Sequence, residues 1–473
     1  MAVTAHTALR AATVLTLLRL VPGYGQPLPH HLAMLAEAPP VPAPKTWTDD
    51  IANRVSAMFA ARARRDVLED DVGLVDRYFD DARLRAPAEL SAKARSVLMS
   101  SAAEYCGAIG RASRGARFGR EALLFADHAP ARYRALSTCA LNFAVNGEYL
   151  AGAGAAAEAH QLFEDNGWEP ADTSFLLLQA HMLMSAARMD ATGLAEAADM
   201  HDMLRPDDSS WVFAAHTARV MRDLLNGDRA AADAASTQLL RGDLTGTLRM
   251  TRFFLFCLRA DVLAAQHRFT EGLEALVSVV SPDGHAICFA MQRSACLLQL
   301  ARERELLADT APCLSHDDHC LRTLVPLLVR RAIAFQRIGE GRRAHQSMES
   351  ALMLIDQTGN STNPFIAMPV DETLSLIEGV VGAHPRLSPL VAPISAALER
   401  VGLPSRGGAV ARLSLTERGV AEALRGSKTL REIAAERGVS LNTVKTQARR
   451  VYRKLGVSGR EGVAGLLPRD GEA

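Results

Sequence analysis

The clearest chemical pattern in this sequence lies near its C-terminal end, in a predicted helix over residues 441–455. Val444, Ala448, Val451 and Leu455 recur at i, i+4, i+7 and i+11, so they form one buried face. The remaining surface is dominated by basic and hydroxyl side chains and has no acidic residue: Thr443, Lys445, Thr446, Arg449, Arg450, Arg453 and Lys454. A helix that presents cations and hydroxyls outward suits a groove lined by phosphates.

Two shorter helices are expected before this one, over about residues 416–424 and 430–437. Each begins with a hydroxyl residue that is followed three residues later by a glutamate. This is the spacing of a capping box, in which the two side chains satisfy free backbone N–H groups at the helix start. The two pairs are Ser414 with Glu417 and Thr429 with Glu432.

The turn before the long helix carries its own signals. Gly438 stops the second helix and Ser440 caps the third, because glycine tolerates the left-handed conformation and serine accepts from free N–H groups. Val439, between them, is expected to be buried in the turn. A brief fourth helix, over residues 460–467, is expected to close the module.

The segment from about residue 411 to 468 resembles the LuxR-type (GerE-like) helix-turn-helix module, and the match is highly specific. The motifs that carry the resemblance, in order and spacing, are Glu432-Ile-Ala, Val439-Ser440, Thr443-Val-Lys445, Lys454-Leu-Gly-Val457 and Arg460. The family implies a four-helix module whose third helix enters the major groove of double-stranded DNA. Its fourth helix commonly supports dimerisation, so a homodimer on DNA is expected.

Carried over residue by residue, the resemblance divides the basic face into two sets. The base-facing positions are Lys445, Thr446 and Arg449, and an arginine there can fork onto guanine O6 and N7. The positions better placed for phosphates are Thr443, Arg450 and Arg453. Phosphate contacts fix the register of the protein on DNA rather than its sequence preference.

Three positions depart from the family pattern. Gly419 stands where the family usually has a glutamate, so the first helix is expected to be held less firmly. Gln447 replaces the common histidine and leaves the identity of a backbone or base contact open. Ala448 replaces a larger aliphatic residue and predicts looser packing under the third helix.

The charge distribution sets this end of the chain apart. The whole chain balances 53 basic against 53 acidic residues, but residues 405–473 hold 14 basic against 7 acidic, a net charge of +7. The remainder therefore carries −7. A basic tail on an acidic body indicates a polyanionic partner for the tail alone.

Cysteine usage and hydropathy bear on the compartment. The 7 cysteines are odd in number and show no framework spacing, which indicates a reducing environment. The apolar run at residues 11–18 is interpreted as an amphipathic helix rather than a signal peptide, and no run is long enough to span a membrane. A cytoplasmic protein is expected.

The rest of the chain has helical periodicity and few strand signals, and its helices come in pairs. Short turn signals recur at intervals of 35 to 41 residues, at Gly110, Gly147, Arg188, Gly227, Arg268, about Glu303, and Gly339. This near-constant period predicts stacked helical hairpins, because each hairpin has an apolar face that only the next can cover.

The hairpins resemble degenerate tetratricopeptide repeats over about residues 85–357, most clearly in segments 260–276 and 332–344. The expected fold is therefore all-α, an α-solenoid of tetratricopeptide-like helical hairpins followed by the four-helix LuxR-type domain. An irregular helical bundle is the alternative to the solenoid. The layout resembles the C-terminal half of the large ATP-binding (maltose-regulator-like) LuxR regulators without their ATPase.

Proline-rich and glycine-rich segments indicate the domain boundaries. The expected divisions are 1–45, an N-terminal helical segment with a Pro-rich linker; 46–400, the helical repeat domain; 401–410, a linker; and 411–473, the DNA-binding domain.

No catalytic, nucleotide or metal site is expected. The phosphate-binding string G-x-x-x-x-G-K-[ST] does not occur, and Gly152-Ala-Gly154 is better explained by helix packing. Cys313, His316, His319 and Cys320 could bind a soft divalent metal, but their spacing matches no common zinc knuckle. No nucleophile lies beside a base, so neither enzyme activity nor a cofactor is expected.

These features predict a sequence-specific DNA-binding transcription regulator whose helical repeats receive an unknown protein or small-molecule effector. The alternative is a helical-repeat scaffold whose C-terminal module docks protein rather than DNA. The lack of acidic residues on the basic face favours DNA, because a protein-docking surface would not need to exclude them.

Overall fold

The computed structural model is almost entirely helical, with 75% of the chain in helices. It describes residues 2–67, 71–277, 286–314, 320–359, 361–403, 413–455, 457 and 459–467. For a few residues within these ranges, Arg453 among them, only the backbone is described. The described residues hold 24 α-helices and one two-stranded sheet, so the all-α prediction is confirmed.

The N-terminal part has an aromatic core of its own. Its elements are α1 (Ala2–Leu18), α2 (Pro29–Glu37), α3 (Asp49–Arg65), α4 (Asp71–Asp76), β1 (Phe79–Asp80) and β2 (Arg83–Leu84). Trp47, Phe59 and Phe79 are fully buried, and the Phe79 ring contacts the rings of both Trp47 and Phe59. The Tyr78 hydroxyl donates to the Val41 carbonyl, which ties the proline-rich segment to this core.

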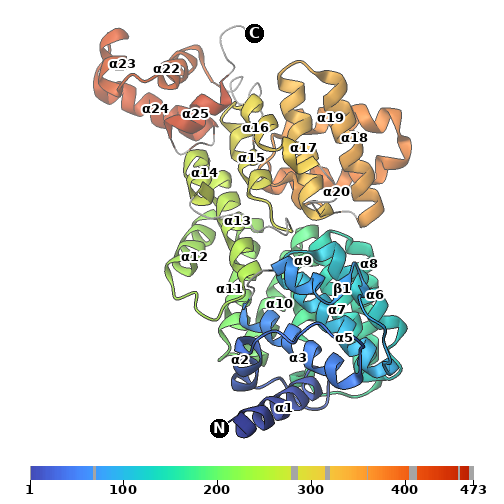
Figure 1. Cartoon of the computed structure of the whole chain (residues 1–473). Coiled ribbons are helices and arrows are strands. Elements are labelled where there is room, and N and C mark those ends of the chain that lie inside the picture. The colour runs from blue at the N-terminus through green and yellow to red at the C-terminus, as the bar shows by residue number, and fades with distance from the viewer. Residues whose placement is uncertain are drawn as a thin grey trace.

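Seven helical hairpins follow, and they make up most of the molecule (Figure 1). They are α5 (Ala92–Ala108) with α6 (Ala112–Leu124), α7 (Ala129–Asn146) with α8 (Tyr149–Asp165), α9 (Phe175–Arg188) with α10 (Ala191–Leu204), α11 (Ser209–Leu225) with α12 (Arg229–Arg241), α13 (Arg249–Ala265) with α14 (Phe269–Val277), α15 (Phe289–Gln299) with α16 (Glu303–Asp309), and α17 (Leu321–Arg337) with α18 (Gly341–Thr358).

Each hairpin turns at one residue in the left-handed conformation. These residues are Gly110, Gly147, Met189, Gly227, His267, Ala301 and Gly339, with φ between 57° and 91°. All seven lie within two residues of a turn predicted from the sequence, so the predicted hairpin turns are confirmed. A left-handed residue ends a helix and lets the chain reverse at once, which explains the short connections.

Small residues let successive hairpins approach closely. A Cβ on Gly119 in α6 would lie 2.6 Å from Cys139 Sγ in α7, and one on Gly272 in α14 would lie 2.8 Å from Cys296 Sγ in α15. Gly152 in α8 is buried, and its Cα faces Met184 and Phe143. The structure thus places this glycine at a helix contact, as the sequence indicated.

The hairpin array bends back, so helices far apart in sequence meet. The N-terminus of α17 lies against the end of α7, where Arg322 Nε donates to the Val145 carbonyl at 3.2 Å. A Cβ on Gly147 would lie 2.5 Å from the Arg322 backbone nitrogen, so the approach requires glycine. Asp66, just after α3, accepts from Arg252 of α13 at 2.6 Å. These contacts close the array into a compact superhelix.

Two further helices, α19 (Val370–Ala383) and α20 (Val391–Val401), complete the array, and α20 packs against α11. Short 3-10 helices lie at Pro170–Asp172, Ala311–Leu314, Asn363–Phe365 and Pro385–Leu390.

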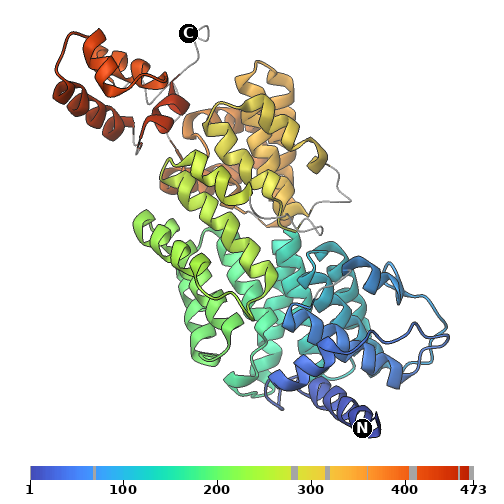
Figure 2. The ribbon, with the colours of Figure 1, turned by 60° about the vertical axis from the view of Figure 1, so that its left-hand side comes forward.

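The C-terminal module consists of α22 (Leu415–Arg425), α23 (Leu430–Glu436), α24 (Leu441–Leu455) and α25 (Arg460–Leu466). It has a separate hydrophobic core. Figures 1 and 2 both show it at the end of the molecule remote from the N-terminus. α25 is its point of contact with the array, against α14 and α15.

Candidate nucleic-acid interface

The long helix α24 is held by one apolar face. It spans Leu441–Leu455 as predicted, and Val444, Ala448, Val451 and Leu455 are at most 2% exposed. They pack with Val420, Leu424 and Ile433 of the two preceding helices. The apolar face predicted from the sequence is therefore confirmed, and it fixes which side of α24 faces outward.

The outward side of α24 carries the basic residues. Thr443, Lys445, Thr446, Arg449 and Arg450 are all exposed. Among the described residues, no acidic side chain pairs with Lys445, Arg449 or Arg450, so these cations are free to meet an external anion. Arg453 lies in the last turn of α24, and its side chain is outside the described ones.

The hydroxyl groups at the start of α24 are partly engaged by the helix itself. Ser440 Oγ accepts from the Thr443 backbone N–H at 3.1 Å, which confirms Ser440 as the cap, and it lies 2.8 Å from Thr443 Oγ1. Thr446 Oγ1 donates to the Asn442 carbonyl at 2.9 Å. With its proton so used, the Thr446 hydroxyl presents acceptor lone pairs and a methyl group outward.

Both predicted capping boxes are present. The Ser414 backbone N–H donates to Glu417 Oε2 at 2.8 Å, and the Glu417 N–H donates to Ser414 Oγ at 3.3 Å. In the second box, the Thr429 N–H donates to Glu432 Oε2 at 2.6 Å. This backbone hydrogen bond, helped by one from the Thr429 hydroxyl, holds the pKa of Glu432 below its usual value. The boxes fix the residues at which α22 and α23 begin. They therefore fix which apolar side chains of these two helices pack against α24.

Val439 corrects one prediction. The sequence indicated that it is buried in the turn, but the side chain is 38% exposed. Gly438 takes the left-handed conformation with φ of 62°, and the Val439 N–H donates to the Ala434 carbonyl at 3.1 Å. The backbone alone thus closes the turn, and the core does not need the Val439 side chain.

Arg460 has a role that the sequence pattern marked but did not explain. Its Nε donates to the Leu424 carbonyl at 2.7 Å, and its Nη2 donates to the Lys428 carbonyl. These carbonyls lie at the end of α22 and in the loop before α23. Because the last carbonyls of a helix lack partners within it, the guanidinium fixes α25 to the helix end.

The structure shows the contacts around two of the positions that depart from the family pattern, Gly419 and Gln447. The Arg437 guanidinium lies over Gly419, where a Cβ would be 2.7 Å from Arg437 Nη1, and it donates to the Thr416 carbonyl at 3.4 Å. Arg437 thus covers the place of the missing side chain, a contact that sequence reasoning missed. Gln447 is half-buried, and its Oε1 has no hydrogen-bond partner among the described residues.

The arrangement defines a small helix-turn-helix module, in which a basic helix is supported by two capped helices and a fourth. Residues 411–466 match the sequence model of the bacterial regulatory proteins of the luxR family (GerE). This match implies a DNA-binding transcription regulator. A search of curated proteins found no match to the chain.

The other candidate cluster is only partly visible. Cys313 and Cys320 are buried, and Cys313 Sγ lies 3.7 Å from Cys288 Sγ. His316 and His319 lie outside the described residues. Within the described part of the chain, no group of three or more potential ligands is arranged to hold a metal. Nor does any described helix have the length and apolar character needed to cross a membrane.

Proposed function

We propose that this chain is a sequence-specific DNA-binding transcription regulator whose helical array is the input domain for an effector or partner. The observation that carries the proposal is α24: an exposed face of basic side chains, with no acidic partner among the described residues, on a helix fixed by its apolar side and within the segment that matches the luxR family. Cations without internal partners are suited to the phosphates and base edges of a DNA groove. No catalytic step or cofactor is part of this proposal.

We assign different roles to the residues of the basic face. Lys445, Thr446 and Arg449 follow one another within about one turn of α24 and read base edges in the major groove. Thr443, Arg450 and Arg453 contact phosphates and set the register. The exposure of the described side chains in both sets supports this assignment.

We further propose that the protein binds DNA as a homodimer and recognises a pseudo-palindromic site, because two-fold symmetric proteins match two-fold symmetric operators. In this proposal, residues 411–473 are the DNA-binding domain, 401–410 the linker, 46–400 the helical repeat domain that receives the input, and 1–45 an N-terminal helical segment with a Pro-rich linker. The separate hydrophobic core of the module supports the boundary at its start.

Genome-wide mapping of bound DNA tests this function, with the full chain and with a chain that ends at residue 408. The full chain is expected to enrich a limited set of sites that share a sequence, and the truncated chain is expected to enrich none. Equal recovery by both chains, or recovery of protein partners through residues 409–473 without DNA, would support the scaffold alternative and overturn the proposal.

A further inference from the structure

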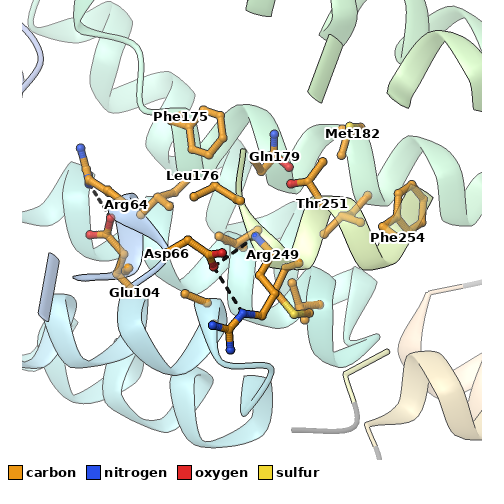
Figure 3. Close-up of a pocket in the computed structure, with 18 of the residues that line it drawn as sticks. Arg64, Asp66, Glu104, Phe175, Leu176, Gln179, Met182, Arg249, Thr251 and Phe254 are labelled. Carbon is orange, nitrogen blue, oxygen red and sulfur yellow. Dashed lines mark hydrogen bonds and ion pairs between the residues drawn. The ribbon is translucent and has the colours of Figure 1, made fainter. Parts of the chain in front are cut away.

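The closed array encloses a cavity between its first and later hairpins (Figure 3). Its walls come from the end of α3 and from α5, α7, α9, α13 and α17. Apart from α3, these are the first helices of their hairpins. In stacked hairpins the first helices share one side of the superhelix, and such inner surfaces are where repeat proteins bind ligands.

The walls of this cavity are mostly apolar. Leu141, Leu176, Leu183, Met250 and Phe254 are among the lining residues. The cavity measures about 100 Å³, and an apolar cavity of roughly 150 Å³ holds benzene. The space therefore suits the hydrocarbon part of a small molecule rather than a peptide or a nucleotide.

The carboxylates that line the cavity already have partners. Asp66 accepts a hydrogen bond from the Arg252 guanidinium at 2.6 Å and another from the Arg249 backbone N–H at 3.2 Å. Figure 3 shows the contact between Asp66 and Arg249. Glu104 accepts from Arg64 at 2.6 Å. Arg322 differs, because its guanidinium donates to two backbone carbonyls, of Val145 and Ala286. A guanidinium has five N–H donors, so Arg322 retains donors, and no carboxylate among the described residues pairs with its charge.

A second cavity, of about 70 Å³, adjoins the first, and Phe254, Ile287 and Arg322 line both. The second cavity is the more polar of the two, because Asp261, Gln292 and Arg330 also line it. Asp261 accepts from Gln292.

Arg330 adds a second incompletely satisfied cation. It is 2% exposed, and its Nε has no hydrogen-bond partner among the described residues. Burial lowers the pKa of Arg330, and the attraction of Asp261 offsets only part of this effect. Four arginines line the two cavities against three carboxylates, namely Arg64, Arg249, Arg322 and Arg330 against Asp66, Glu104 and Asp261. The excess is therefore positive.

We propose that these adjoining cavities form one binding site for a small amphipathic carboxylate, with its apolar body between α5, α9 and α13 and its anionic group between Arg322 and Arg330. Charge-assisted hydrogen bonds from the guanidinium groups fix the carboxylate, and the apolar walls select a short hydrocarbon or aromatic body. The identification of this ligand as the effector rests on the proposed function, but the site itself does not.

Binding of simple probes to the full-length protein tests the site. We would titrate benzoate and hexanoate by calorimetry, with the uncharged benzamide and hexanamide as matched controls. The carboxylates are expected to bind saturably and at least about tenfold more tightly than the amides, because a charged hydrogen bond contributes roughly 1.5–3 kcal/mol. Absence of saturable carboxylate binding, or equal affinity for acid and amide, overturns the proposal.

Two variants locate the site. Arg322→Gln removes the charge, and Ala108→Leu fills the apolar cavity without removing any hydrogen bond. Each is expected to weaken carboxylate binding at least about tenfold, whereas Arg304→Gln, an exposed arginine of α16, is expected to leave it unchanged. Circular dichroism confirms folding, and Ala108→Leu keeps the test decisive if Arg322→Gln unfolds. Wild-type affinity in the folded cavity variant overturns the site.

Operator binding in the same samples separates this inference from the proposed function. A change in operator affinity with benzoate supports both. Carboxylate binding that depends on Arg322 but leaves operator affinity unchanged supports the site and contradicts its use as the input. Operator binding without any carboxylate binding overturns the site alone.

Discussion

Arginine serves opposite purposes in the two parts of this molecule. On α24 of the C-terminal module, Arg449 and Arg450 are exposed, and no acidic side chain in the described part of the chain pairs with them. In the hairpin array, the partly exposed Arg252 joins α13 to the end of α3, and the buried Arg330 faces a cavity. The chain holds 48 arginines, so composition does not separate the two uses. Only placement distinguishes a cation available to DNA from one that closes a fold.

The separation of the hydrophobic core of the module from the cores of the array gives the largest expected effect. Val451→Asp places a charge in the core of the module and is expected to cost at least about 3 kcal/mol, enough to unfold it. Hydrogen exchange measured by mass spectrometry should show that residues 413–467 lose their protection. The array should keep the protection that it has in the wild type. Val439→Asp, at a 38% exposed position, is the matched control and should leave both parts protected. Loss of protection throughout the array as well would contradict the claim that the core of the module is independent of the array.

His267 lies at the contact between the two parts, where a Cβ on Gly462 of α25 would be 3.5 Å from the His267 Cβ, and its titration predicts a pH dependence of stability. Burial, together with a smaller contribution from the nearby Arg229 charge, lowers the pKa of this residue from 6.5 to about 4. The folded state therefore binds the proton less well than the unfolded state. The stability conferred by the neutral ring is present above pH 6.5 and is lost as the pH falls toward 4, by about 3 kcal/mol.

The measurement compares the wild-type protein with His267→Asn, because asparagine tolerates the left-handed backbone at this turn. The melting temperature of the wild type should fall more steeply than that of the variant between pH 7 and pH 4. Parallel pH profiles would show that His267 does not titrate in this way.

Closure of the array is tested at Asp66. Asp66→Ala removes the ion pair with Arg252 and is expected to cost about 2 kcal/mol, less than for a fully buried pair because Arg252 is partly exposed. The melting temperature of the array should fall while DNA affinity stays unchanged. Asp81→Ala breaks an exposed pair with Arg117 at a residue with the same left-handed φ of 55° as Asp66, so this matched control carries the same backbone cost and should have a clearly smaller effect. Equal effects of the two substitutions would contradict the closure.

The smallest effect concerns the departure at Gly419. Gly419→Ala is expected to stabilise the module by up to about 1 kcal/mol, because alanine favours a helix and the crowding Arg437 group is the end of a flexible side chain. Gly154→Ala, in α8 with open space around its Cα, should stabilise the array by a similar amount. Chemical denaturation followed region by region by hydrogen exchange gives both values. Destabilisation of the module would mean that Arg437 cannot move aside.

The sequence predicted local structure well in both parts. Helix ends, capping boxes and hairpin turns depend on residues within a few positions of one another. Ser414 and Thr429 therefore predicted the two capping boxes, and Gly339 predicted a hairpin turn. The bend of the array is different, because it accumulates from small rotations between hairpins. The contact of Arg322 with Val145 joins residues 177 positions apart, and nothing in the spacing indicates it. The cavities result from that closure, so the sequence could not predict them either.

The same limit applies within the module. The basic face of α24 follows from helical periodicity alone, and the exposed positions of Lys445 and Arg449 agree with it. The exposure of Val439 could not be predicted, because it depends on how closely α23 and α24 approach. The position of Arg437 over Gly419 depends likewise on the packing of α22 against its neighbours.

The most direct test of the central claim is the salt dependence of operator binding by the full-length protein, measured by fluorescence anisotropy. The account predicts binding that weakens steeply with salt. Arg450→Ala should reduce the slope of log affinity against log salt concentration by about 1, because one phosphate contact is lost. Arg449→Ala should weaken the binding free energy by roughly 1–3 kcal/mol and relax the sequence preference at one base position. Arg304→Ala, exposed on the array, should change neither quantity. Binding that is insensitive to salt, or unchanged in Arg449→Ala and Arg450→Ala, would contradict the assignment of α24 as the DNA-reading helix.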